Sequence, residues 1–404
     1  MNLGIPLWDG GPDLAMLFLA MKLVTTPPVE GLAAADHPLY ATSKRFVALL
    51  ESSGTMSMLY LQAMILVALY EFGHSIYPAA WMTIGSCARY AQILGIPSYS
   101  DSCLVLGQCT TWTEAEERRR AWWAVYILDR AISLGSKKGY ALSEPTDLDA
   151  LPVDDVAWDD GDMARAFQRR VTTPLEDRQG PFTRLAQASV LLSKTRNYIR
   201  DTRLRALNNE GDAVDISEVA RMTEQLSQLC TYIDNEMKAE LTSETADSSP
   251  FFARMAARCI VWSTVIMILD AYSCPETMRE QYGTPGPALK SEAELAMQVE
   301  AIDGLRKSSD RILEFGRTLL EFTADMTTAE LGRVSPLILD SMYCAMATYH
   351  WLWKEGGNPE VEEALEEVKS ALRRLTLRWR LASEYLIIEE YHDVTTMMAI
   401  RAGT

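Results

Sequence analysis

Apolar positions along the chain recur mostly at spacings of three and four residues, with polar positions filling the gaps between them. This spacing places apolar side chains on one face of an α-helix. No segment shows the two-residue alternation of a half-buried strand, and no sequence repeat recurs at a fixed interval. The pattern therefore predicts an all-α protein, a large multi-helix bundle or array around an apolar core.

Proline and glycine residues divide this pattern into separate helices. We expect one helix in each of the segments 13–25, 38–51, 56–72, 78–94, 113–134, 181–208, 216–241, 250–272, 290–325, 336–354 and 359 to about 399. The polar or glycine- and proline-rich segments between them are expected to be loops or linkers, chiefly 135–160, 242–250 and 276–288. An N-terminal half (1–160) and a C-terminal half (161–404) are expected to join in one continuous domain.

The helix predicted at 113–134 is the central element of this arrangement. Thr113 and Glu116 have the spacing of a capping box, and Gly135 is placed to end the helix. Apolar residues, among them Trp122 and Trp123, fall on two stripes of this helix. A helix that is apolar on two sides is expected to be buried on two sides.

Charged residues interrupt those apolar stripes. Arg118 lies three turns before Asp129, roughly 16 Å at the helical rise, so these two side chains are too far apart to pair. An unpaired buried charge is costly, so we expect Arg118, Asp129 and Arg130 each to meet a partner on another helix. A structural role, fixing how the helices pack, is favoured over binding of a ligand.

The central segment reads E-E-R-R-R-x-W-W-x-x-Y-x-L-D-R, followed by a glycine-containing loop and D-x-D-x-L-P. This pattern resembles the middle homology region of fungal-specific transcription factors, the regulatory domain that follows a binuclear zinc-cluster DNA-binding head. The matching residues are Glu117, Arg118, Arg119, Arg120, Trp122, Trp123, Tyr126, Leu128, Asp129, Arg130, Gly139, Asp147, Asp149, Leu151 and Pro152. Segments 61–63, 70–71, 81–95 and 378–382 also look like that family. The resemblance implies a ligand-responsive regulatory domain that acts in the nucleus.

Composition and charge limit the partners of the chain. Its 404 residues are 48% hydrophobic and 23% charged, as in a globular protein with a substantial core. The net charge of −17 disfavours binding to a phosphate backbone. No C-x2-C pair occurs, so the zinc-cluster head is expected to be absent and direct nucleic-acid binding by this chain is not expected. Seven scattered cysteines indicate reduced thiols in an intracellular protein of the nucleus or cytoplasm.

The sequence offers little for a metal, a cofactor or a membrane. No two of the four histidines have the three- or four-residue spacing of helical metal ligands, and no phosphate-binding or dinucleotide loop is present. We therefore expect neither a metal nor a cofactor. The longest uncharged stretch, 52–70, is shorter in apolar residues than the ~20 that a membrane span needs. The N-terminus lacks the basic region of a signal peptide.

Four residues are weak candidates for catalytic chemistry, namely Glu71, His74, Asp129 and His350. His74 follows the predicted helix 56–72, where a histidine more commonly caps the helix against its dipole. His350 belongs to an aromatic cluster, which is more typical of a packed core or a pocket wall than of a catalytic site. A structural role is therefore favoured for each histidine.

Two functions from different classes remain open. The first is a regulatory module that responds to a hydrophobic small molecule or a regulatory protein, with homodimerisation as a further possibility. The second is a biosynthetic enzyme derived from a transcription factor, a cyclase, isomerase or pericyclase acting on a hydrophobic secondary-metabolite intermediate. Both need an apolar cavity, expected between segments 113–134, 56–72, 78–94 and 343–353. Its expected lining residues are Tyr70, Trp81, Arg89, Trp122, Tyr126, Arg130, Tyr343 and Trp351.

Overall fold

The computed structural model describes residues 10–96, 105–134, 139–208, 215–241, 249–273 and 292–402. Over these ranges the chain is built from helices and contains no strand, and an isolated antiparallel bridge joins Ala150 to Arg170. The predicted all-α class is confirmed. The expected loop at 276–288 and most of the expected linker at 242–250 lie outside the described residues.

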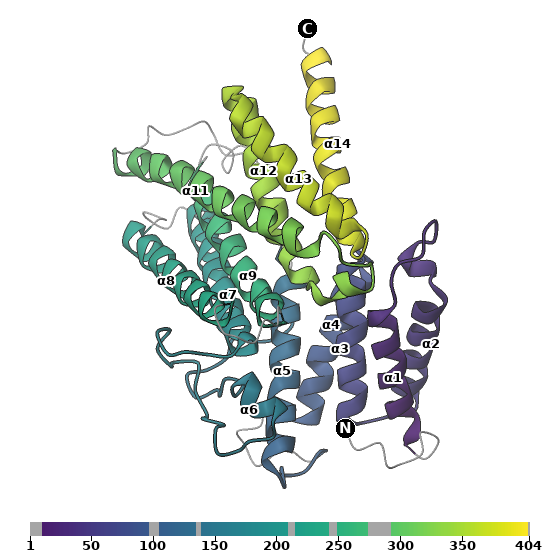
Figure 1. Ribbon diagram of the computed structural model, residues 1–404. Coiled ribbons are helices and arrows are strands. Elements are labelled where there is room, and N and C mark those ends of the chain that lie inside the picture. The colour runs from purple at the N-terminus through teal and green to yellow at the C-terminus, as the bar shows by residue number, and fades with distance from the viewer. Residues whose placement is uncertain are drawn as a thin grey trace.

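The first group of helices surrounds α3. Its members are α1 (Gly11–Thr25), the short η2 (Ala34–Asp36), α2 (Pro38–Ser52), α3 (Met58–Gly73), α4 (Ala79–Leu94) and α5 (Trp112–Ile132). Helix α3 is apolar nearly all round and packs against α1, α4 and α5. Helix α5 also packs against α7, so it lies between the first and the second group (Figure 1).

The second group is centred on α9. Its members are α6 (Asp155–Asp159), α7 (Pro181–Leu207), α8 (Ile216–Leu241) and α9 (Ser249–Ser273). Within α9, the segment Phe251–Ser273 is long and apolar enough to cross a membrane by length and composition alone. However, 72% of its most apolar window is buried in the protein, against α7, α8 and α11, which is the packing of a core helix. The short helix α6 lies where the sequence predicted only loop.

The third group lies across one end of the other two (Figure 1). Its members are α11 (Glu292–Thr323), η3 (Glu330–Arg333), η4 (Pro336–Ile338), α12 (Leu339–Gly356), α13 (Pro359–Thr376) and α14 (Arg380–Ala402). Buried apolar side chains from all three groups, from Met16 to Ala382, belong to one contiguous cluster. The groups therefore share one large apolar core, and a smaller cluster of buried apolar residues lies beside Ile268 of α9.

The ends of the central helix differ from the prediction. The N-cap of helix α5 lies two residues earlier than expected, because the Thr111 hydroxyl, and not that of Thr113, accepts the N–H of Glu114 at 3.1 Å. It ends at Ile132, before Gly135, with Ser133 at the C-cap. Burial on two sides is confirmed, since Trp122 and Trp123 are both buried.

The prediction of one helix from 359 to about 399 is wrong. The chain leaves the helical path after Thr376 and starts α14 at Arg380. The interruption turns Trp379 into the core, where its indole N–H donates to the Val334 carbonyl at 2.8 Å. No glycine or proline marks this break, which explains why the sequence pattern missed it.

Candidate functional site

The first half of α5 holds the segment around residue 153. The buried Glu116 carboxylate accepts the N–H of Val153 at 2.9 Å, and the guanidinium of Arg120 donates to the Val153 carbonyl at 3.0 Å. Arg120 also pairs with Asp155 at 2.9 Å, and Arg119 pairs with Glu116. These motif residues therefore have a direct structural use: they fix the connection between α5 and α7.

The second half of α5 holds the loop at 141–144. The Asp129 carboxylate accepts the N–H groups of Ala141 and Leu142, both at 3.0 Å, and pairs with Arg130 at 2.7 Å. Arg130 donates to the Leu142 carbonyl at 2.9 Å and reaches the Ser193 hydroxyl of α7 at 3.3 Å. Burial raises the pKa of Asp129, although these donors act to lower it.

The expectation that each of these charges meets a partner on another helix is therefore largely wrong. Asp129 is paired with its neighbour Arg130 and with loop backbone, whereas Arg130 reaches across to Ser193 of α7. Arg118 pairs with Glu114 one turn away on the same helix and donates to the carbonyls of two residues that precede it, at 106 and 107. Backbone N–H and C=O groups are partners of Arg118 and Asp129, and the pattern of side chains in the sequence does not predict such contacts.

Aromatic side chains pack against one another on α5, where the sequence placed one wall of the expected cavity. The Trp122 and Tyr126 rings stack with centroids 5.5 Å apart, and Trp123 meets Trp122 edge-on at 4.8 Å. The Arg130 guanidinium lies 3.8 Å from the centroid of the Tyr126 ring. Stacking and cation–π contacts of this kind stabilise a packed core.

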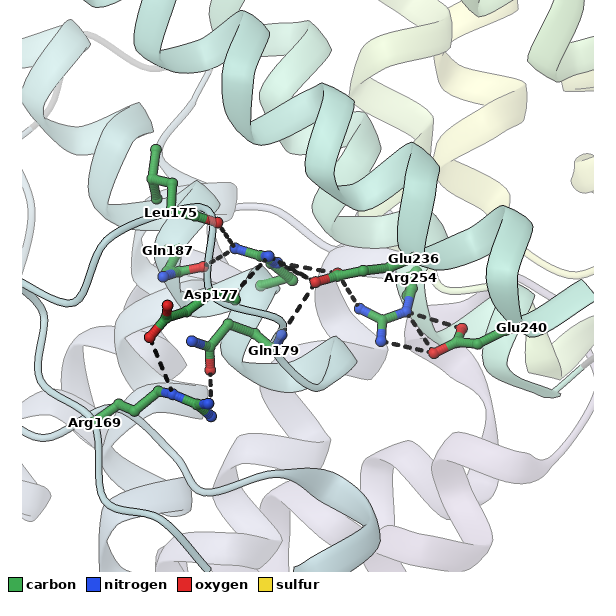
Figure 2. Close-up of polar contacts among 9 residues, drawn as sticks. Arg169, Leu175, Asp177, Gln179, Gln187, Glu236, Glu240 and Arg254 are labelled. Atoms are coloured by element: carbon green, nitrogen blue, oxygen red, sulfur yellow. Dashed lines mark hydrogen bonds and ion pairs between the residues drawn. The ribbon is translucent and has the colours of Figure 1, made fainter.

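A second buried charge network links α7, α8 and α9 (Figure 2). Glu236 of α8 accepts hydrogen bonds from Arg184 at 2.6 Å and from Arg254 at 2.7 Å. Arg254 also pairs with Glu240 at 2.7 Å. Two guanidinium groups therefore face two carboxylates, so the buried charges balance, as favourable burial of ions requires. Nothing in the helical pattern of the sequence revealed this network.

A pocket of about 560 Å³ opens at the C-terminal end of α3. It is bounded by the end of α1 and the loop that follows it, by the last turn of α3, and by the junction of α13 with α14. Its lining residues are Leu23, Thr26, Pro27, Pro28, Val29, Gly31, Leu32, Ala33, Ala34, His37, Tyr70, His74, Thr376, Arg380 and Ser383. The volume is within the range of about 300–1,000 Å³ that small-molecule sites occupy.

His74 is the buried polar side chain of this pocket. It is the C-cap residue of α3, and its ring is 2% exposed. Neither ring nitrogen has a hydrogen-bond partner among the residues that the structure describes. Burial, reinforced by the positive charges of Arg378 and Arg380 and by His37, lowers the pKa of His74 to about 3. The imidazole is thus neutral at physiological pH, and a charge–dipole cap of α3 is not its role.

Two other polar side chains of the pocket, those of His37 and Arg380, can donate hydrogen bonds. His37 accepts the N–H of Leu39 with its Nδ1 at 3.2 Å, so the neutral ring carries its proton on Nε2 and can donate it. The Nε–H of Arg380 donates to the Glu384 carboxylate at 3.3 Å, and the Arg380 side chain is 51% exposed. Tyr70 donates to the Ala34 carbonyl at 3.2 Å and fixes the loop above the pocket. No acidic side chain is among the lining residues in the described part of the chain.

A buried guanidinium lies close behind this pocket. Arg378 is 1% exposed and donates to the carbonyls of Val24 and Thr26, the latter a lining residue. Among the described residues it has no carboxylate partner, in contrast to the buried Arg130, Arg184 and Arg254. Carbonyl dipoles and the Trp379 ring, whose centroid lies 4.3 Å away, are thus the groups that offset its charge in the described part of the chain.

The structure disperses the residues that the sequence grouped into one cavity. Tyr70 and His74 line the pocket. The remaining residues lie elsewhere: Trp122, Tyr126, Asp129 and Arg130 in the packed cluster of α5, Trp81 half-buried and Arg89 exposed on α4, and Tyr343, His350 and Trp351 on α12. Helix α12 has α9, α11, α13 and α14 as its main neighbours, which is why its aromatic residues are not beside the central helix.

Two of the weak catalytic candidates have partners elsewhere in the protein. Glu71 is buried and accepts hydrogen bonds from Tyr40 and Lys44, both at 2.8 Å. His350 pairs with the buried Glu389. Among the described residues no group of three or more histidine, cysteine, aspartate or glutamate side chains could hold a metal ion.

Sequence reasoning missed much of the pocket. His37, Arg380 and Ser383 were not assigned to it, although segment 378–382 already stood out by its resemblance to the family. The break after Thr376 gives these residues their place, and that break has no local mark in the sequence.

Comparison with protein families identifies the class. Residues 13–252, more than half of the chain, match the family model described as the fungal specific transcription factor domain. The chain belongs to this family, as its central motif predicted. Membership in a family of transcription factors indicates an intracellular protein. No solved structure gives a significant match to the chain.

Curated relatives share parts of the sequence. Transcription factor BOA15 of Botryotinia fuckeliana is 40% identical over 111 residues, covering 27% of this chain and 59% of the relative. The pigment biosynthesis transcriptional activator pigB of Monascus ruber is 35% identical over 148 residues, covering 34% and 27%. The azaphilone cluster-specific transcription factor azaR of Aspergillus niger is 35% identical over 115 residues, covering 26% and 25%. The matches thus span between a quarter and three fifths of these relatives, each named as a regulator of transcription.

Proposed function

We propose that this chain is the regulatory module of a nuclear transcription regulator that controls a secondary-metabolite gene cluster, and that it responds to a small molecule. The family and the names of the relatives support the regulatory part of this proposal. We propose that contact with DNA is made by another element, because the chain carries a net charge of −17 and no paired cysteines.

The observation that carries the small-molecule part is the pocket at the end of α3. A volume of about 560 Å³ next to a buried imidazole that has no hydrogen-bond partner in the described part of the chain is unusual in a packed helical core. The pocket also joins segments distant in sequence, since Arg378 binds the carbonyls of Val24 and Thr26. Occupancy could therefore bias the position of α14 relative to α1, which is what a ligand-responsive module requires.

A reporter experiment tests this proposal. The chain is fused to a heterologous DNA-binding head, and reporter output is measured while fungal secondary metabolites and their precursors are added one at a time. We expect at least one compound to change the output, and to raise the melting temperature of the purified chain by linkage. Chromatography of each stabilised sample checks that the compound is unchanged. If no compound alters output or melting, the small-molecule proposal fails and a protein partner replaces it; a new product peak would instead indicate an enzyme.

A further inference from the structure

The pocket has polar side chains at its buried inner end and at its exposed rim, with an apolar wall between them. His74 and Tyr70 are nearly fully buried and form its inner end, while Val29 is 52% exposed and the Arg380 side chain is 51% exposed at the rim. Between these ends the wall is aliphatic, formed mainly by leucine, proline, valine and alanine side chains of the segment 23–34. A ligand that fits must therefore be apolar in its middle and polar at both ends.

The charged lining residue of the pocket is a cation, although the protein is strongly acidic. The chain has a net charge of −17, yet the pocket presents Arg380, which bonds Glu384 through Nε, and the Nε2–H of His37, with no acidic lining residue in the described part of the chain. The buried Arg378 adds a guanidinium that lacks a carboxylate partner among described residues. Ser383 also lies in the first turn of α14, where the helix dipole favours an anion.

His74 supplies the independent sign that something binds here. Its two ring nitrogens are buried without hydrogen-bond partners among the described residues, and leaving buried polar atoms unpaired is unfavourable. In the neutral ring one nitrogen donates and the other accepts. A ligand hydroxyl satisfies either nitrogen, because a hydroxyl is both donor and acceptor.

From these features we infer that the pocket binds an amphipathic carboxylic acid: its carboxylate is held at the rim by Arg380 and His37, its apolar body lies along segment 23–34, and a hydroxyl or carbonyl group at the far end bonds His74. This inference rests on the proposed small-molecule function and names the chemical class of the ligand. The three groups act on different parts of the same molecule, so each can be removed separately.

Matched probes separate the contributions. We would titrate the full chain with 2-naphthoic acid, 4-pentylbenzoic acid and 2,4-dihydroxy-6-pentylbenzoic acid, each beside its methyl ester, and measure Kd by calorimetry. An ion pair made at a partly desolvated rim predicts that acids bind about tenfold more tightly than their esters, a factor of ten being 1.4 kcal/mol. The dihydroxy acid, which alone can reach His74 with a hydroxyl, is expected to bind most tightly.

Variants assign the effect to residues. Arg380→Gln is expected to remove the preference for acids while ester binding stays unchanged. Arg373→Gln is the matched control, because Arg373 is an exposed arginine of α13 that pairs with Glu366 and does not line the pocket. Val29→Trp, at an exposed lining position, is expected to block acids and esters alike without disturbing the core.

The outcomes distinguish two failures. If an acid and its ester bind equally and Val29→Trp blocks both, the pocket binds small molecules but the inference of a carboxylate is overturned. If none of the six probes binds, or if Val29→Trp binds them as wild type does, this pocket is not the binding site. The small-molecule proposal is then no longer supported by the pocket. A preference for acids that survives Arg380→Gln would overturn the assigned position of the carboxylate.

Discussion

His74 and Trp379 face each other with ring centroids 5.5 Å apart, and this contact joins the end of α3 to the start of α14. The two residues are far apart in the sequence. His74 is the C-cap residue of α3, and Trp379 lies in the short connection between α13 and α14. The contact therefore couples the N-terminal helices to the last helix directly beside the pocket.

Gly73 makes this approach possible. A Cβ at Gly73 would lie 2.5 Å from Cε3 of Trp379, so Gly73→Ala forces the indole or α3 to move. We expect the free energy of unfolding to fall by about 1–3 kcal/mol, as for other overpacked cores. Chemical denaturation measures this change. Gly85→Ala is the control: no atom lies within 4 Å of its added Cβ, so that variant should be as stable as wild type or more stable. Equal stability of the two variants would contradict the close contact.

Helix ends that are set by local residues could be predicted from the sequence, whereas those set by contacts between distant segments could not. The helices α3 and α4 were predicted within a few residues, because Gly73, Gly95 and the apolar spacing define them locally. The break before Arg380 was not, because it is imposed by burial of Trp379 against Gly73 and Val334 from other parts of the chain. The site depends on that break, so only its α3 side, Tyr70 and His74, could be named in advance.

The indole of Trp123 tests the core around the central helix. Trp123 is fully buried, and its N–H donates to the Ala150 carbonyl at 2.9 Å. We expect Trp123→Ala to lower the free energy of unfolding by about 3–5 kcal/mol through loss of buried surface and the resulting cavity. Met82→Ala, at a 58% exposed position of α4, should change stability by less than about 0.5 kcal/mol. A similar small effect at Trp123 would show that the packing described here is wrong.

The carboxylate of Asp129 tests whether the family motif is structural. Asp129→Ala removes the buried carboxylate that pairs with Arg130 and leaves it only the half-exposed Glu144, at 3.2 Å, as a carboxylate partner among the described residues. It also leaves two loop N–H groups without their acceptor, so we expect a loss of about 3–5 kcal/mol. Asp303→Ala removes an exposed ion pair with Lys307 and should cost no more than about 1 kcal/mol. If Asp129→Ala melts as wild type does and yet abolishes regulation, the residue has a functional role instead.

His74 makes stability depend on pH. Its pKa falls from an ordinary 6.5 to about 3 on folding, so between these values the unfolded chain binds a proton that the folded chain does not. Stability is then lost as the pH falls through this window, by up to about 1.4 kcal/mol per pH unit from this residue. We expect His74→Phe, which cannot titrate, to lose less free energy of unfolding than wild type between pH 6.5 and 4.5, as measured by chemical denaturation of both proteins at each pH. An equal loss of stability in the two proteins would contradict a buried neutral imidazole.

Hydrogen–deuterium exchange tests most directly whether a small molecule binds at the end of α3. The full chain is compared with and without saturating 2,4-dihydroxy-6-pentylbenzoic acid. We predict slower exchange in residues 26–37 and 376–383, the two segments that close the pocket over His74, with no such change in Val29→Trp. Unchanged exchange in both segments would contradict binding of a small molecule at the end of α3. So would protection confined to the separate hollow of about 320 Å³ that residues of α7 and α8 line.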